Sequence, residues 1–171
     1  MRMAGPMKAK RRKQPGATGK SAGIDFSLMD AFAGHLIRVV QVRLFQLYFE
    51  RLAHLGVSPG AFSVLAAIHS NPGIAHGTLS DILAAHGPNI TKLVDRLVRA
   101  GWVERRKLPD DRRTTGHYLT AHGRAKAERI LKAGLAHDKR ATSALSVRER
   151  GTLLRLLAKL DRVLAAGARS I

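Results

Sequence analysis

The sequence predicts a mostly α-helical protein that carries one small β-hairpin. Only 5% of its 171 residues are aromatic, and Leu and Ala dominate the apolar set, which favours helices packed on helices. After residue 27, apolar residues recur at helical spacing through most of the chain. Only between residues 102 and 119 does the spacing change to the alternation that is typical of strands.

The chain is strongly basic. Its net charge is +18, of which +7 belongs to residues 1–20, and the remaining residues still carry +11. A folded part this basic indicates a polyanionic partner, although an Arg-rich proteome also produces such solvated surfaces. The absence of cysteine excludes disulfides and thiolate metal sites. No apolar run approaches the roughly 20 residues that span a bilayer, so we expect a cytoplasmic protein without a membrane partner.

The first 23 residues are rich in Lys, Arg, Gly, Pro and Ala, and Met is their only sizeable apolar type. Such a segment buries too little surface to offset its ordering entropy, so residues 1–23 are predicted to form a disordered basic arm. The arm either attracts phosphates non-specifically or is an ordinary flexible terminus.

One long helix is predicted within residues 24–57. Ser27 and Asp30 resemble a capping box at its start, and Gly56 ends it. Its apolar residues lie on more than one side of the helix: Leu28, Phe32, Leu36, Val39, Val40, Leu44, Leu47, Phe49 and Leu52. The helix therefore needs two partners, which are the core of its own chain and a second subunit.

Three further helices are predicted before residue 101. Ser58-Pro59 is a strong start signal, because a capping hydroxyl precedes a proline at the first helical position. That helix stops at Asn71-Pro72-Gly73, and a short helix follows at about 76–83. After a turn at 84–86, another helix runs from about Gly87 to Ala100.

A hairpin and two helices close the chain. Residues 102–106 and 115–119 are predicted as its two strands, joined by the polar loop 109–113, which makes the tip basic. Helices are predicted at 121–140 and 147–166. The second of these opens on a full capping box, Ser146-Val147-Arg148-Glu149.

The order of helix, short turn, helix and basic hairpin is typical of helix-turn-helix DNA-binding proteins, which place the second helix in the major groove. In the helix from Gly87 one stripe is apolar, formed by Ile90, Leu93, Val94, Leu97 and Val98. The other side is polar: Asn89, Thr91, Lys92, Asp95, Arg96 and Arg99. Asn can bond adenine, and Lys and Arg can bond guanine or phosphate, so this side is a candidate DNA-binding face.

Residues 72–123 resemble the winged helix-turn-helix of the multiple-antibiotic-resistance regulator (MarR) family, and the resemblance extends over residues 25–167. Five short motifs carry it in order: Leu79-Ser80-Asp81-Ile82-Leu83, Ile90-Thr91-Lys92-Leu93-Val94-Asp95-Arg96-Leu97, Gly101-Trp102-Val103-Glu104-Arg105, Asp111-Arg112-Arg113 and Leu119-Thr120-Ala121-His122-Gly123. No single motif is diagnostic, but all of them in order are fairly specific. The resemblance implies a winged helix-turn-helix domain over residues 58–120.

The resemblance also implies which residues contact DNA. The recognition helix would contribute Asn89, Thr91, Lys92 and Arg96, and the loop would contribute Asp111, Arg112 and Arg113. Arg113 would enter the minor groove as the wing-tip arginine, with Asp111 orienting it through a charge-assisted bond.

The resemblance further implies a homodimer, joined by the dimerisation helix at 24–57 and the C-terminal helices at 121–171. Its two recognition helices would contact a pseudo-palindromic operator with half-sites about 34–36 Å apart.

This chain departs from the family pattern around the turn. The family often has Gly where this chain has Ala84, Ser or Thr where it has His86, and a long polar residue where it has Gly87. Because Gly87 and Pro88 lack polar side chains, fewer bases would be contacted directly, and DNA shape would carry more of the specificity.

The resemblance suggests a small-molecule effector, with aromatic carboxylates, phenolics and thioesters as frequent types. Candidate effector-binding residues are His35, Arg38 and Arg43 of the first helix and Phe62 and His69 of the next. An apolar pocket with one or two cations would suit an anionic aromatic ligand. Alternatively, the arginines serve the surface or the dimer interface. We therefore expect a ligand-responsive regulator, of repressor type, that such an effector releases from its operator.

Three other functions have weaker support. An enzyme is not expected, because Gly16–Ser21 resembles a phosphate-binding loop only in part, Gln14 stands where a glycine is needed, and no catalytic residue set or cofactor motif is visible. The eight histidines lack the spacing of a metal site. A sequence-independent architectural DNA binder remains open and would bind specific and random DNA with the same affinity and salt dependence.

Overall fold

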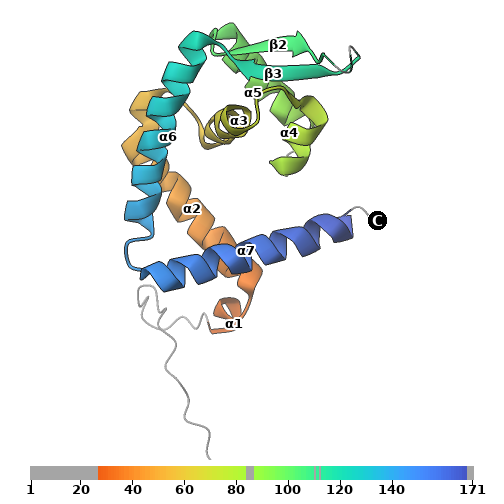
Figure 1. Cartoon of the computed structure of the whole chain (residues 1–171). Coiled ribbons are helices and arrows are strands. Elements are labelled where there is room, and N and C mark those ends of the chain that lie inside the picture. The colour runs from red at the N-terminus through yellow and green to blue at the C-terminus, as the bar shows by residue number, and fades with distance from the viewer. Residues whose placement is uncertain (1–26, 84–86, 110, 112, 169–171) are drawn as a thin grey trace, which may run out of the picture. The chain divides into compact units, whose positions relative to one another are not determined.

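The computed structural model describes residues 27–83, 87–109, 111 and 113–168, and it divides into two compact units, Met1–Val39 and Val40–Ile171. Helices dominate, and one small antiparallel sheet lies at one end of the second unit (Figure 1). The predicted basic arm at 1–23 and the predicted turn at 84–86, with Ala84 and His86, lie outside the described residues.

The first predicted helix is interrupted. The structure has a single helical turn, α1 (Ser27–Asp30), and then the long helix α2 (Ala33–Leu52), so the prediction of one continuous helix is wrong. The break arises because the Ala31 and Phe32 backbone N–H groups donate to carbonyls three residues back, at 3.2 and 3.1 Å, instead of four. At its other end α2 tightens into a 3-10 turn, η1 (Ala53–Leu55), which Gly56 ends as predicted with a left-handed φ of 67°.

The helices of the winged region begin and end close to their predicted positions. Helix α3 (Pro59–Ser70) is capped by Ser58, whose side chain accepts a hydrogen bond from the Ala61 backbone N–H at 3.3 Å. Helix α4 (His76–Ile82) and helix α5 (Gly87–Arg99) follow. Gly101 has a left-handed φ of 70° immediately after α5.

The sheet contains one strand that the sequence did not predict. Strands β2 (Val103–Lys107) and β3 (Thr115–Leu119) form the expected hairpin, and the two-residue strand β1 (Ile74–Ala75) pairs antiparallel with the other edge of β3. In this register Ile74 lies opposite His117, and His117 lies opposite Arg105. The order β1-β3-β2 therefore ties the segment before α4 to the hairpin.

The two C-terminal helices are α6 (Ala121–Ala141) and α7 (Val147–Ala168). The predicted capping box at α7 is confirmed: the Ser146 backbone N–H donates to Glu149 Oε2 at 2.9 Å, and the Glu149 N–H donates to Ser146 Oγ at 3.3 Å. An ion pair between Arg150 and Asp138 joins the start of α7 to the end of α6.

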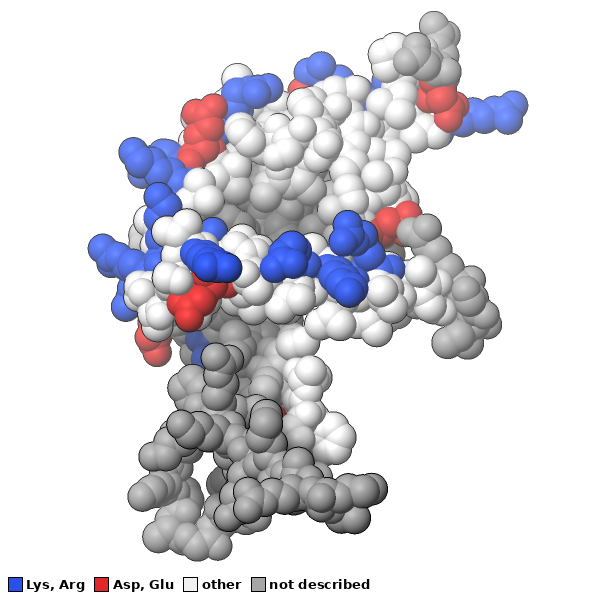
Figure 2. Space-filling view, turned by 60° about the horizontal axis from the view of Figure 1, so that its bottom comes forward, with Lys and Arg blue, Asp and Glu red and all other residues white. Residues whose placement is uncertain are grey.

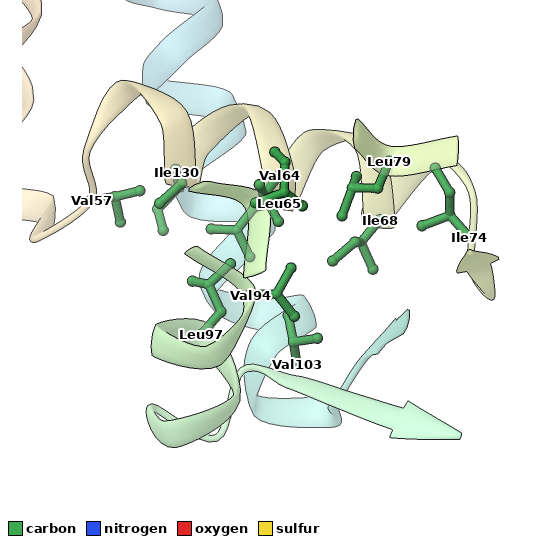
Figure 3. Packing of buried hydrophobic residues seen from close by; sticks show 12 residues of the cluster. Val57, Val64, Leu65, Ile68, Ile74, Leu79, Val94, Leu97, Val103 and Ile130 are labelled. Atoms are coloured by element: carbon green, nitrogen blue, oxygen red, sulfur yellow. The ribbon is translucent and has the colours of Figure 1, made fainter. Parts of the chain in front are cut away.

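The core lies where α3, α4, α5, β2 and α6 meet, and Figure 3 shows its side chains pointing toward one another. Val64, Leu65 and Ile68 of α3 are completely buried. The packing between α6 and the hairpin is close, because a Cβ on Gly123 would lie 1.8 Å from the Trp102 carbonyl oxygen. These contacts fix α5 and the hairpin against one common core.

Among the described residues no single helix is long and apolar enough to cross a membrane, whereas α2 with η1 and α3 reach that length and composition only as a pair bent by 70°.

Candidate nucleic-acid interface

Helix α5 has one buried and one exposed side. Ile90, Val94 and Leu97 are between 0% and 4% exposed and belong to the core. The four predicted DNA-contacting residues of this helix, Asn89, Thr91, Lys92 and Arg96, are all exposed. Because the buried side fixes the helix, the exposed side presents a polar and basic face on a rigid support.

Asp95 lies between these two sides and is tied to the hairpin. Its Oδ1 accepts a hydrogen bond from Arg105 on β2 at 2.5 Å, and both side chains are about two-fifths exposed. The Arg105 guanidinium is therefore already paired with a carboxylate of the same chain. An ion pair this accessible adds little to folding stability, so its effect is mainly on geometry.

The hairpin loop is organised by Asp111. Its Oδ1 accepts from the Arg113 backbone N–H at 2.9 Å, and its Oδ2 accepts from Thr114 Oγ1 at 2.5 Å. These hydrogen bonds, with the one from the Thr114 side chain strongest, hold the pKa of Asp111 below its ordinary value. Asp111 thus fixes the Arg113 backbone rather than its guanidinium. Arg113 is exposed, and Arg112 lies outside the described residues.

Basic side chains line the hairpin. Arg105, Arg106 and Lys107 follow one another on β2, and all three are exposed. The Arg106 guanidinium lies over the Tyr118 ring, 5.2 Å from its centre, and also pairs with Glu104. A basic surface of this kind attracts phosphates. Lys and Arg also outnumber Asp and Glu on the face that Figure 2 shows, which has α7 in front.

Two histidines to which sequence reasoning gave no role in DNA binding pack against each other, and one of them contacts α5. His76 Nε2 shares a hydrogen bond with Thr91 Oγ1 at 3.2 Å, and its ring centre lies 5.7 Å from that of His117. His117 is 1% exposed, and its Nδ1 donates to the Ile74 carbonyl at 2.9 Å. Burial lowers the pKa of His117, because it disfavours the charged ring.

A cavity of about 240 Å³ lies between α2, α3 and α6. Its lining is largely apolar and aromatic, with a few polar groups: Leu44, Phe45, Tyr48, Pro59, Phe62, Ser63, Gly134, His137 and Asp138. The Tyr48 hydroxyl donates to the Val57 carbonyl at 2.9 Å, and its ring packs edge-on against Phe62 and His137. The buried Nδ1 of His137 has no hydrogen-bond partner among the described residues.

The predicted effector residues do not all meet at this cavity. Phe62 lines it, whereas His69 lines a separate space of about 20 Å³ with Tyr118 and Arg124. Arg43 is exposed and lines neither space. His35 and Arg38 belong to the N-terminal unit, where His35 is half-buried and Arg38 exposed.

The cavity residues Tyr48 and His137 were missed by sequence reasoning, because only the packing of α2 on α6 brings them together. Within the described parts of the chain, no three His, Asp or Glu side chains are close enough to hold a metal ion.

The fold and the exposed face of α5 define a winged helix-turn-helix protein of the DNA-binding type. The family model that matches residues 57–115 is that of the MarR family. Together with the relatives described next, this match shows that the chain belongs to the MarR family of transcriptional regulators.

The relatives match about three quarters or more of this chain. A putative transcriptional regulatory protein for the hcr operon of Thauera aromatica is 31% identical over 84% of this chain and 90% of its own length. The multiple antibiotic resistance protein MarR of Escherichia coli K12 is 33% identical over 74% and 89% of the two chains. Among solved structures, the transcriptional repressor CouR bound to a 23-mer DNA duplex has a TM-score of 0.74 and 28% identity, covering 81% of this chain and 99% of its own.

Proposed function

We propose that this chain is a homodimeric cytoplasmic repressor that binds a pseudo-palindromic operator and leaves it when a small organic anion binds. The proposal rests on one observation: α5 is fixed to the same core as a basic hairpin and exposes four polar or basic residues, Asn89, Thr91, Lys92 and Arg96. The repressor CouR, which shares this fold at 28% identity, has been solved on duplex DNA. By analogy, α5 would enter the major groove and Arg113 the neighbouring minor groove.

The apolar side of α7 supports the homodimer. Its residues lie on one side of the helix and are between 39% and 70% exposed: Leu153, Leu154, Leu156, Leu157, Leu160, Val163 and Leu164. An apolar surface of this kind marks an interface. A second copy presenting the same helix would cover it and place two α5 helices on one operator.

Footprinting on the DNA that flanks this protein's own gene tests the proposal. A regulator protects a defined stretch and binds it roughly 10³-fold or more tightly than random DNA at the same salt concentration. The strong positive charge also favours the architectural alternative, for which the two affinities and their salt dependences would be equal.

The effector proposal is supported by the cavity beside Phe62. The walls are aromatic with a few polar groups, which are Ser63, His137 and Asp138, and Asp138 is paired with Arg150. Such a lining suits an aromatic carboxylate or the acyl part of a thioester. The other predicted effector residues, His35, Arg38, Arg43 and His69, do not line this cavity and stay predictions from the family resemblance. A panel of aromatic acids and acyl thioesters should contain a compound that raises the Tm and lowers operator affinity. If no member of the panel changes either quantity, this part of the proposal is wrong.

A further inference from the structure

The recognition helix α5 is tied to the rest of the winged domain at two points that lie one turn apart. At the first, Thr91 Oγ1 and His76 Nε2 share a hydrogen bond of 3.2 Å. At the second, Asp95 Oδ1 accepts from Arg105 at 2.5 Å. Residues four apart lie on the same side of a helix, so both contacts hold one side of α5. The first of them reaches an exposed side chain of the candidate DNA-binding face.

The residues that make these two contacts with α5, His76 and Arg105, are both neighbours of the buried residue His117. The His76 ring packs beside it, with 5.7 Å between ring centres, and Arg105 lies directly opposite it in the sheet. His117 is itself held by the Ile74 carbonyl, at 2.9 Å from Nδ1. A carbonyl can only accept, so Nδ1 carries the proton and the ring orientation is fixed. His117 is thus a rigid support from which His76 reaches α5.

We propose that His76 is a positioning residue of the DNA-binding surface, which rests on the operator-binding function proposed above. His76 packs against His117 and fixes the Thr91 side chain through their hydrogen bond. It thereby affects which DNA sequence α5 prefers, although His76 itself contacts no base. A surface that is held in its binding geometry loses less entropy on the operator, so removing the support weakens specific binding first. Random DNA, held through phosphates, would be affected little.

The test uses the full-length chain and a pool of about 30-base-pair random duplexes, long enough for two half-sites one helical turn apart. Affinities are measured for the duplex that the wild type enriches and for an unselected duplex, over a range of salt concentrations. His76→Leu should lower affinity for the enriched duplex about 5-fold, the size of one hydrogen bond, while affinity for random DNA and the salt slope stay unchanged. His76→Gln, which can still bond Thr91, should recover most of the loss. His122→Leu, at an exposed histidine on α6, is the matched control.

A double-mutant cycle with Thr91→Val separates positioning from contact. If His76 acts through Thr91, His76→Leu causes little further loss once Thr91 is Val. An equal loss in that background would show that His76 contacts the DNA directly and not through Thr91, and it would overturn the proposal. An equal loss on both duplexes with a lower Tm would show a merely structural role and overturn it too, as would unchanged affinity. A pool from which no duplex is enriched would contradict the proposed function itself, whereas an enriched duplex that His76→Leu binds normally contradicts only this inference.

Discussion

Leucine side chains are buried in the winged domain and exposed on the last helix of this chain. In the winged domain Leu65 and Leu79 are completely buried, whereas on α7 Leu154, Leu157 and Leu164 are 50%, 39% and 70% exposed. The winged domain therefore completes its core within one chain, and α7 does not. The difference indicates that the core shared by the winged domain and α6 is complete within one chain, whereas the apolar side of α7 is left for another surface to cover.

The polar side of α7 leads to the same conclusion. Arg148, Arg155, Lys159 and Arg162 recur at helical spacing on the side opposite the leucines, and all four are exposed. Figure 2 shows Lys and Arg side chains in a row along α7. Water can solvate this basic side but not the apolar one, so the proposed partner is expected on one side of the helix only.

The largest expected effect comes from placing charge on the apolar side of α7. Leu157→Glu with Leu160→Glu should weaken dimerisation at least about 100-fold, because two carboxylates would be buried without partners. Sedimentation equilibrium measures the dimer, and circular dichroism should still show folded helices. Arg155→Gln with Lys159→Gln changes the net charge equally on the opposite side and should leave the dimer intact. A wild-type chain that sediments as a monomer would contradict the comparison.

A substitution at Leu65 tests whether the core of the winged domain is complete within one chain. Leu65→Ala removes a completely buried side chain and should lower the free energy of unfolding by about 3 kcal/mol, as core truncations do. Leu135→Ala, at a position that is 65% exposed, should change it by less than about 0.5 kcal/mol. Urea denaturation at two protein concentrations measures both. The Leu65→Ala loss should be the same at both, because it arises within one chain. Similar losses for the two variants would show that the core is misassigned.

Arg113 tests whether the winged domain carries the DNA contacts. Arg113→Ala should weaken operator binding by roughly 30-fold, since a charge-assisted contact contributes about 2 kcal/mol, while the Tm and the dimer stay unchanged. Arg129→Ala serves as the control, because Arg129 is an exposed arginine on α6, away from the hairpin loop. Unchanged affinity in Arg113→Ala would show that the wing assignment is wrong.

The predictable part of the fold is the part governed by local rules. Ser58 and Ser146 cap the helices that they were predicted to cap, and Gly56 and Gly101 adopt the left-handed conformation that ends a helix. The break after Asp30 was missed, because apolar spacing continues across it. Strand β1 was missed because two residues are too short for an alternating pattern and are extended only through their pairing with β3.

The candidate site was predictable to the same extent. The spacing of apolar residues in α5 was enough to predict that Asn89 and Lys92 would be exposed. The contacts that hold the helix were not predictable, since Thr91 and His76 are 15 residues apart and Arg105 is 10 residues from Asp95, with no local pattern joining them. Which of these exposed residues contact DNA stays a prediction.

The smallest expected effect is on how folding stability depends on pH, which we expect the winged domain to determine and α7 not to. Because burial lowers the pKa of His117 in the folded chain, the unfolded chain takes up a proton first as the pH falls. Stability should therefore be complete above the ordinary histidine pKa of about 6.5 and decrease as the pH falls below it toward the folded pKa. Thermal melts between about pH 7.5 and about pH 5.5 should show a Tm that falls by a few degrees.

His117→Asn can still donate to the Ile74 carbonyl but cannot titrate, so its Tm should fall less over the same range. His122→Asn, at an exposed position on α6, should keep the wild-type slope. Equal slopes in all three proteins would mean that the buried histidine of the winged domain does not set the acid sensitivity. The lowered pKa values of Asp111 and Glu149 keep both carboxylates ionised over this range, so the acid sensitivity would then have to come from groups other than these two and His117.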